Sequence, residues 1–310
     1  MRTSRFRSSR LLVAAATVLS LAALTACGSS DSNSDPNTIV VGSANFTESE
    51  TIANIYAEAL RVNGFDVSTS FNIGSREAYI PALKDGSITL IPDYTGNLLQ
   101  YLDPTATATS SEDVLAALPA ALGSELVITT PASAQDKDAV VVTKETVDKW
   151  NLKTIADLAP HSAEVKFGAP AEFQERPAGL PGLKANYGLD IAASNFVPIA
   201  DGGGPTTVKA LASGDVTAAN IFTASASIPA NNFVVLEDPK NNFPAQNVVP
   251  VLRASASSDK LAAVLDAVSA KLTTEELLAL NVSVSGDSKT EPAAAAKSWI
   301  AAQGLDKPVA

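Results

Sequence analysis

Two stretches of the sequence match one another, ALKDGSIT at residues 82–89 and ALASGDVT at residues 210–217. In each, an apolar helical pattern stops at a glycine, which adopts the left-handed backbone of a helix end without strain, and a short strand pattern follows. The match predicts two similar α/β halves in one chain. Ligands of open α/β sheets bind beyond the carboxyl ends of the strands, so we expect a ligand cleft between the halves.

Strand and helix patterns alternate on both sides of these stretches. Short apolar runs predict strands at residues 38–43, 65–71, 88–91, 139–142, 165–168, 196–199, 216–222, 233–237 and 248–252. Helical spacing of apolar residues predicts helices at residues 47–62, 77–84, 114–122, 182–187, 206–212, 259–271, 274–281 and 292–303. This alternation favours mostly parallel sheets, with polar loops at residues 92–96 and 171–176 after strands.

The N-terminus has the pattern of a bacterial lipoprotein signal peptide over residues 1–26. Four arginines precede an apolar run at residues 11–24, which is too short to span a bilayer comfortably, since that takes ~20 apolar residues. Small residues then lead to Cys27, as in the bacterial lipobox. An ordinary signal peptide with an incidental cysteine is the alternative, but Cys27 is the only cysteine and can form no internal disulfide. We therefore expect Cys27 to be lipidated and to anchor the protein to the outer face of the cell membrane.

The segment after the signal peptide is polar, and the mature chain is acidic. Residues 28–37 contain no apolar residue, so we expect residues 27–37 to form a flexible tether. Without the signal peptide the chain has 18 basic and 33 acidic residues, a formal charge of −15. This charge argues against nucleic acid as a partner and favours, weakly, a cationic or zwitterionic ligand. A body of about 270 residues is large for one core and suits two lobes.

The residues that metal and nucleophile chemistry require are scarce. The chain has one histidine, His161, and one cysteine, too few for a zinc cluster, and no Gly-x-Ser-x-Gly motif. Three glycines at residues 202–204 lack the Lys-Ser/Thr pair of a phosphate-binding loop, so we interpret them as a turn. His161 follows a proline in a polar segment and is expected to be exposed. We expect no metal or other cofactor.

Three classes of function remain open on these residues alone. The first is a transport receptor for a small solute. The second is an extracytoplasmic hydrolase that uses paired carboxylates, although no acidic pair stands out by its context. The third is a lipoprotein that binds a protein or a cell-wall component.

Four motifs, in order along the chain, resemble those of the substrate-binding proteins of osmoprotectant ABC importers, which bind glycine betaine, carnitine or choline. They are VVGSANFTE at residues 40–48, DYTG at residues 93–96, Glu172-Phe173 with Arg176 and Gly179, and Phe243-Pro244. The resemblance extends from about Ile39 to the C-terminus. It implies an extracytoplasmic solute-binding component of an ABC importer, not an enzyme, that delivers its solute to a membrane permease.

The resemblance also implies a two-lobed, type II periplasmic-binding fold whose chain crosses twice between the lobes. The crossings are expected near residues 136–138 and 243–247. Lobe 1 would then comprise residues 38–135 and 245–310, and lobe 2 residues 136–244.

In the family that the motifs resemble, aromatic faces hold a quaternary ammonium, and basic and polar groups hold a carboxylate. By motif, Tyr94 keeps an aromatic position and Arg176 keeps the carboxylate clamp. Asp138, Phe222 and Gln246 stand where tyrosines are common, while Ala44 replaces a lysine and Asn97 a threonine. The expected ligand-binding residues are Asn45, Tyr94, Asn97, Asp138, Arg176, Phe222 and Gln246.

The incomplete aromatic set leaves the identity of the ligand open. A carboxylate at residue 138 suits a cation that donates hydrogen bonds better than a trimethylammonium. Without the motifs, the favoured explanation of Arg176 is a surface arginine paired with Glu172 or Glu175. Asp138 is then a solvated turn residue, and Tyr94 a half-buried loop tyrosine.

Overall fold

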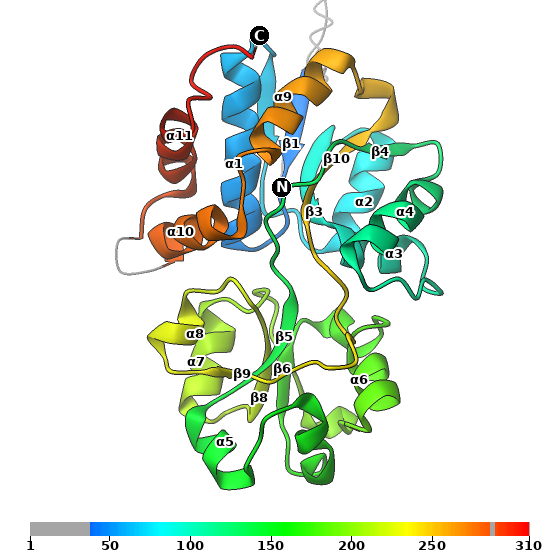
Figure 1. Cartoon of the computed structure of the whole chain (residues 1–310), viewed down its shortest axis with the longest axis vertical. Helices are drawn as coiled ribbons and strands as arrows, with labels where there is room; N and C mark the ends of the chain where they lie inside the picture. Colours follow the sequence, from blue (N-terminus) through cyan, green and yellow to red (C-terminus); the bar gives the residue numbers. More distant parts are fainter. Residues whose placement is uncertain (1–37, 286–288, 310) are drawn as a thin grey trace, which may run out of the picture. The chain divides into compact units, whose positions relative to one another are not determined.

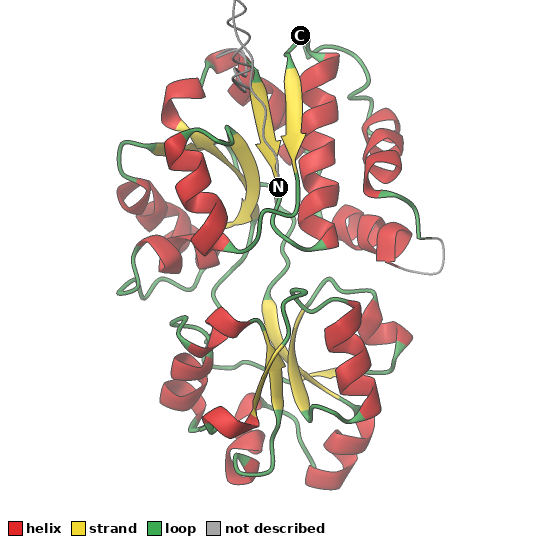
Figure 2. Ribbon diagram, turned by 180° about the vertical axis from the view of Figure 1, so that it is seen from behind, coloured by secondary structure: helices red, strands yellow, loops and turns green. Residues whose placement is uncertain are grey.

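The computed structural model describes residues 38–285 and 289–309, so the predicted signal peptide, Cys27 and the tether lie outside the described residues. The described chain forms two α/β lobes, each built on a five-stranded sheet with helices on both faces (Figures 1 and 2). Two extended segments connect the lobes, one leading into β5 and the other into β10. These segments pair with each other at an antiparallel bridge between Gln135 and Asn247.

The sheet of lobe 1 has the strand order β2-β1-β3-β10-β4. Its strands are β1 (Ile39–Gly42), β2 (Val67–Ser70), β3 (Leu90–Tyr94), β4 (Leu126–Ile128) and β10 (Val248–Arg253). One face packs on α1 (Thr47–Val62), α9 (Asp259–Ser269), α10 (Thr274–Ser285) and α11 (Pro292–Ala302). The other face packs on α2 (Arg76–Asp85), α3 (Thr95–Leu102) and α4 (Ser111–Leu122). Burial of apolar side chains on both faces stabilises this lobe.

The sheet of lobe 2 repeats this plan with the order β7-β6-β8-β5-β9. Its strands are β5 (Asp138–Val142), β6 (Phe167–Ala169), β7 (Phe196–Pro198), β8 (Ala218–Phe222) and β9 (Val234–Val235). Its helices are α5 (Lys144–Trp150), α6 (Leu180–Tyr187), α7 (Pro205–Ser213) and α8 (Ser227–Ala230), with 3-10 turns at Ile155–His161, Ala171–Gln174 and Ala193–Asn195. Each face of this sheet carries its own apolar cluster.

The two matching stretches occupy equivalent places in the two lobes, as predicted. Gly86 ends α2 before β3, and Gly214 ends α7 before β8, with left-handed φ angles of 88° and 77°. In each lobe the strand that follows pairs antiparallel with the strand that enters from the connecting segment: β3 with β10, and β8 with β5. The polar residues at the carboxyl ends of β3 and β8 therefore face the region between the lobes.

Several local predictions are wrong. Each mostly parallel sheet contains one antiparallel strand that was not predicted, because β10 and β5 enter from the other lobe and run against their neighbours. Residues 92–96 form no loop, since β3 continues through Tyr94 and α3 begins at Thr95. Pro92 lies opposite Pro250 in the ladder between β3 and β10. Two prolines fit there because the residues of a non-hydrogen-bonded antiparallel pair donate no N–H to each other. His161 is half-buried and stacks on Trp150, with ring centroids 4.3 Å apart.

Candidate functional site

A cavity of about 240 Å³ lies between the lobes, where strand ends from both sheets meet. Lobe 1 contributes the segment after β1, the start of α2 and the end of β3. Lobe 2 contributes the start of β5, the end of β8, the 3-10 turn after β6 and the turn at residue 202. The lining residues are Ala44, Asn45, Phe46, Ser75, Arg76, Tyr79, Pro92, Tyr94, Asn97, Asp136, Asp138, Pro170, Glu172, Phe173, Arg176, Ala200, Gly202, Asn220 and Phe222.

Three aromatic rings cluster in the wall of this cavity. The ring centroid of Phe46 lies 6.2 Å from that of Tyr94 and 5.6 Å from that of Phe222. Tyr94 ends β3, Phe222 ends β8, and Phe46 precedes the first turn of α1. Sequence reasoning missed Phe46, although the residue lies inside the first motif and follows a strand end. Aromatic faces attract cations, so the cluster suits a cationic group.

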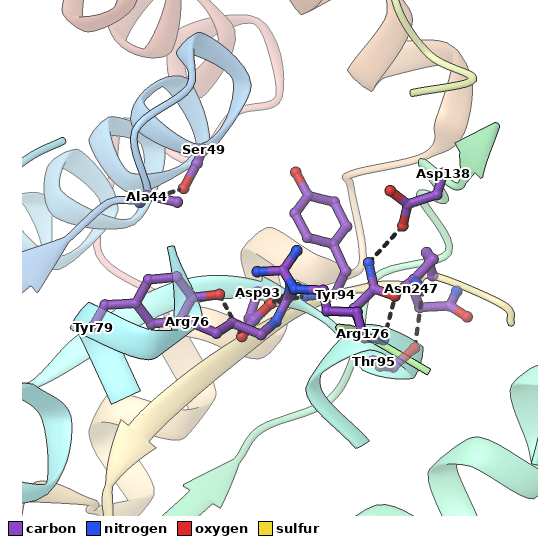
Figure 3. A network of polar contacts seen from close by, with 12 residues as sticks. Ala44, Ser49, Arg76, Tyr79, Asp93, Tyr94, Thr95, Asp138, Arg176 and Asn247 are labelled. Carbon is purple, nitrogen blue, oxygen red and sulfur yellow. Dashed lines mark hydrogen bonds and ion pairs between the residues drawn. The ribbon is translucent and has the colours of Figure 1, made fainter. Parts of the chain in front are cut away.

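Asp138 lies beside these rings as the first residue of β5, in register with Phe222 of β8. Its carboxylate accepts a hydrogen bond of 2.6 Å from Nδ2 of Asn97 in lobe 1. Figure 3 shows Asp138 near the side chain of Tyr94. Among the described residues Asp138 forms no ion pair, so its negative charge is available to a ligand in the cavity.

Arg176 also lines the cavity, and it is paired with two carboxylates. Its Nη2 donates to Glu77 of α2 in lobe 1 at 3.2 Å and to Glu172 in lobe 2 at 3.3 Å. The pairing with Glu172 is therefore present, whereas the partner from lobe 1 was not foreseen. Arg176 holds the two lobes together at this edge of the cavity.

Arg76, Tyr79 and Asp93 form a buried polar cluster on the lobe 1 side (Figure 3). Arg76 makes an ion pair with Asp93, which also accepts hydrogen bonds from the Tyr79 hydroxyl at 2.9 Å and the Tyr94 backbone N–H at 2.7 Å. Neither Arg76 nor Asp93 was predicted as a site residue. The signal available in the sequence was Asp93 in the second motif, directly before Tyr94.

A second buried cluster joins Glu48 to Asp136 at the first crossing. Glu48 accepts hydrogen bonds from the Tyr94 hydroxyl and from Nδ2 of Asn281. Asp136 accepts from the backbone N–H of Ala224 at 2.6 Å. Burial raises the pKa of Asp136 well above its ordinary value, and the neighbouring Glu48 carboxylate raises it further. Burial also raises the pKa of Glu48, so the pair holds a proton at pH values where an exposed pair is fully ionised.

The comparisons with known proteins agree with this geometry. The family described as the substrate binding domain of ABC-type glycine betaine transport systems matches residues 37–302. The chain belongs to this family. Its members are transport binding proteins rather than enzymes, are extracytoplasmic, and work with an ABC permease.

Two relatives illustrate the family. The glycine betaine-binding protein YehZ of Escherichia coli (strain K12) is 28% identical over 257 residues, covering 79% of this chain and 84% of that protein. A glycine-betaine-binding protein of Pseudomonas aeruginosa is 27% identical over 273 residues, covering 84% and 86%.

A solved structure supports the fold. A crystal structure described as a glycine betaine/carnitine/choline ABC transporter aligns with 87% of this chain and 100% of its own, with 22% identity and a TM-score of 0.66. The predicted two-lobed, type II periplasmic-binding fold is confirmed by this likeness and by the order of the two sheets.

The fold of this family member brings six of the seven predicted ligand-binding residues to one cavity. They are Asn45, Tyr94, Asn97, Asp138, Arg176 and Phe222. Gln246 was expected at the edge of the site but lies outside the lining. Its side chain is fully buried, and its Oε1 accepts a hydrogen bond of 3.1 Å from the backbone N–H of Asn97. It lies there because the second crossing packs against the start of α3.

Within residues 38–285 and 289–309 no group of three or more His, Cys, Asp or Glu residues is placed to hold a metal ion. No helix in these ranges is long and apolar enough to cross a membrane. The glycines at residues 202 and 203 take positive φ angles of 58° and 80° in a turn that approaches Phe46.

Proposed function

We propose that this protein captures a small cationic or zwitterionic solute of the osmoprotectant class outside the cell and delivers it to an ABC permease. The observation that carries the proposal is the cluster of Phe46, Tyr94 and Phe222 beside the Asp138 carboxylate in the cavity between the lobes. The two relatives named for glycine betaine support the solute class.

In the proposed complex the cationic end of the solute lies among the three aromatic rings, next to Asp138. Each aromatic face contributes ~0.5–2 kcal/mol to the binding of a cation. Phe46 compensates for one of the tyrosines absent at residues 138 and 246. Asp138 adds a charge-assisted hydrogen bond if the cation carries an N–H group. Arg176 lies toward the anionic end, Asn97 holds Asp138 from lobe 1, and Asn45 lies at the rim.

We propose that the solute closes the cleft by a hinge motion at residues 136–138 and 243–247, which divide the chain into residues 38–135 with 245–310 and residues 136–244. Three polar contacts between the lobes support this division: Asn97 with Asp138, Arg176 with Glu77, and Asn45 Nδ2 with the carbonyl of Ala200 at 3.2 Å. A solute that replaces or strengthens these contacts stabilises the closed form.

The proposed function predicts a specific order of ligands. Calorimetric titration of residues 38–310 should give tighter binding of dimethylglycine, whose protonated amine donates to Asp138, than of glycine betaine, whose trimethylammonium does not. Asp138→Tyr should reverse the order, because it replaces the acceptor with an aromatic face. Lys144→Ala, at an exposed ion pair on lobe 2, serves as the control. Absence of binding by both solutes and by choline would refute the proposed function.

We further propose that Cys27 is acylated and anchors the protein, which rests on the lipobox-like run before it and the polar segment after it. In cells, Cys27→Ala should release the protein into the medium or leave its signal peptide uncleaved. The same substitution should not alter solute binding by the folded body. Mass spectrometry of the N-terminal peptide checks the lipid. Membrane retention of the variant together with an unmodified N-terminal peptide would contradict this prediction.

A further inference from the structure

Arg76 is a buried cation whose hydrogen-bonding capacity is largely unused. It is the first residue of α2, its side chain lies in the wall of the cavity, and the residue is 7% exposed. A guanidinium has five N–H donors. Among the described residues Arg76 uses one nitrogen, Nη2, which binds Asp93. Its Nε is buried without a hydrogen-bond partner in the described chain.

Asp93 has at most one acceptor position left for the four remaining N–H donors of Arg76. One of its oxygens already accepts from Arg76 and from the Tyr94 backbone N–H, and the other accepts from the Tyr79 hydroxyl. A buried polar group without a partner destabilises the folded protein, and more so when it is charged. Because Arg76 also lines the cavity, an acceptor group in the cavity can bind the part of the guanidinium that Asp93 leaves free.

Arg176 differs from Arg76 in the exposure of its side chain and in the number of its carboxylate partners. Its side chain is 27% exposed, and it is neutralised by Glu77 and Glu172 together. Arg76 has one carboxylate partner and is more deeply buried, so its field in the cavity is less screened by water. A planar fork also suits a carboxylate, which accepts two parallel hydrogen bonds.

We infer that Arg76 holds the anionic end of the solute, and that the site therefore selects carboxylate-bearing zwitterions over cations that lack an anionic group. The inference rests on the proposed function of the same cavity and adds a residue that the motifs do not indicate. The aromatic cluster and Asp138 take the cationic end, and Arg76 takes the carboxylate.

Glycine betaine and choline test this inference, because both carry a trimethylammonium and only the first carries a carboxylate. Removing Arg76 alone would leave Asp93 buried and unpaired, so the test uses the charge-matched double variant Arg76→Gln with Asp93→Asn. Calorimetric titration should show glycine betaine weakened by about tenfold to a hundredfold, as expected for a charged hydrogen bond in a cavity, and choline by less than about threefold. Arg61→Gln, which removes an exposed arginine of α1, should change neither affinity. Equal weakening of both solutes, or unchanged glycine betaine binding, would overturn the inference.

A second probe separates this inference from the proposed function. Thermal unfolding is measured in rising sodium acetate, with sodium chloride at matched ionic strength as the reference. Acetate should raise the melting temperature of the wild-type protein and not that of the double variant. If neither glycine betaine nor choline binds the wild-type protein, the proposed function fails while this acetate result still supports Arg76. An acetate effect that is equal in both proteins, or absent from both, overturns the inference.

Discussion

Replacing Arg176 with alanine is expected to weaken glycine betaine binding by more than about tenfold. The guanidinium offsets the charges of Glu77 and Glu172 at one edge of the cavity. Without it, these two carboxylates and Asp138 repel the anionic end of a zwitterion. A charged hydrogen bond contributes ~1.5–3 kcal/mol, and ~1.4 kcal/mol is a tenfold change in affinity. Calorimetric titration at constant ionic strength gives the measurement.

Two variants control for this substitution. Arg176→Lys keeps the positive charge and should recover part of the affinity, although a lysine lacks the bidentate fork. Lys184→Ala removes an exposed cation of the same lobe that pairs with Asp190 away from the cavity, and it should have no effect. Choline binding should not weaken in Arg176→Ala, because the site becomes more negative. Unchanged glycine betaine affinity in Arg176→Ala would exclude a role for this residue in binding the anionic end.

The elements with long apolar periodicity were predictable from the sequence. The bounds of α1 at residues 47–62 agree with the prediction, because its buried face repeats at helical spacing over four turns. The glycines at residues 86 and 214 also marked helix ends correctly, since both take the left-handed backbone that other residues rarely adopt. These two features were enough to predict two α/β lobes and a cleft.

Strand direction was not predictable in the same way. A strand buried on both faces shows a continuous apolar run whether its neighbours are parallel or antiparallel. Strands β5 and β10 therefore gave no sign in the sequence that they run against β8 and β3. Their direction follows from the path of the chain between the lobes, which is a property of the tertiary structure.

The cavity was predictable only in part, for a related reason. Motif positions placed Tyr94 and Phe222 at strand ends and Asn97 in the first turn of the helix after β3, where the fold exposes side chains to the cleft. The Arg76–Asp93 and Glu48–Asp136 pairs join residues 17 or more positions apart. Only their burial in the folded protein distinguishes these four residues from other charged residues of the sequence. Gln246 shows the opposite case, because a residue next to a crossing can point into the protein rather than into the cleft.

The Glu48–Asp136 pair is expected to make the protein less stable as the pH rises from acidic to neutral. In the unfolded chain both carboxyls have ordinary pKa values of about 4. In the folded protein burial raises the pKa of Asp136 well above this range and raises that of Glu48. The folded state therefore binds more protons than the unfolded state above pH ~4, so the free energy of unfolding decreases with pH. The stabilising contribution of the pair is complete at pH values below the pKa of the two carboxyls in the unfolded chain. It is lost as the pH rises through their raised pKa in the folded protein.

Asp136→Asn isolates this contribution, because the amide keeps the shape of the side chain and does not titrate. Urea unfolding of both proteins between pH 4.5 and 8 should show the wild-type protein losing stability relative to the variant as the pH rises. The carboxyls of Glu77, Asp85, Asp103 and Asp157 have lowered pKa values and contribute in the opposite direction. They are present in both proteins and cancel in the difference.

A difference in unfolding free energy between the wild-type protein and Asp136→Asn that stays constant over this pH range would show that Glu48 and Asp136 do not share a proton in the folded protein. The cluster also includes Tyr94 and Asn281, so loss of that proton at higher pH would place a second negative charge next to the hydroxyl of Tyr94, one of the three aromatic residues of the cavity.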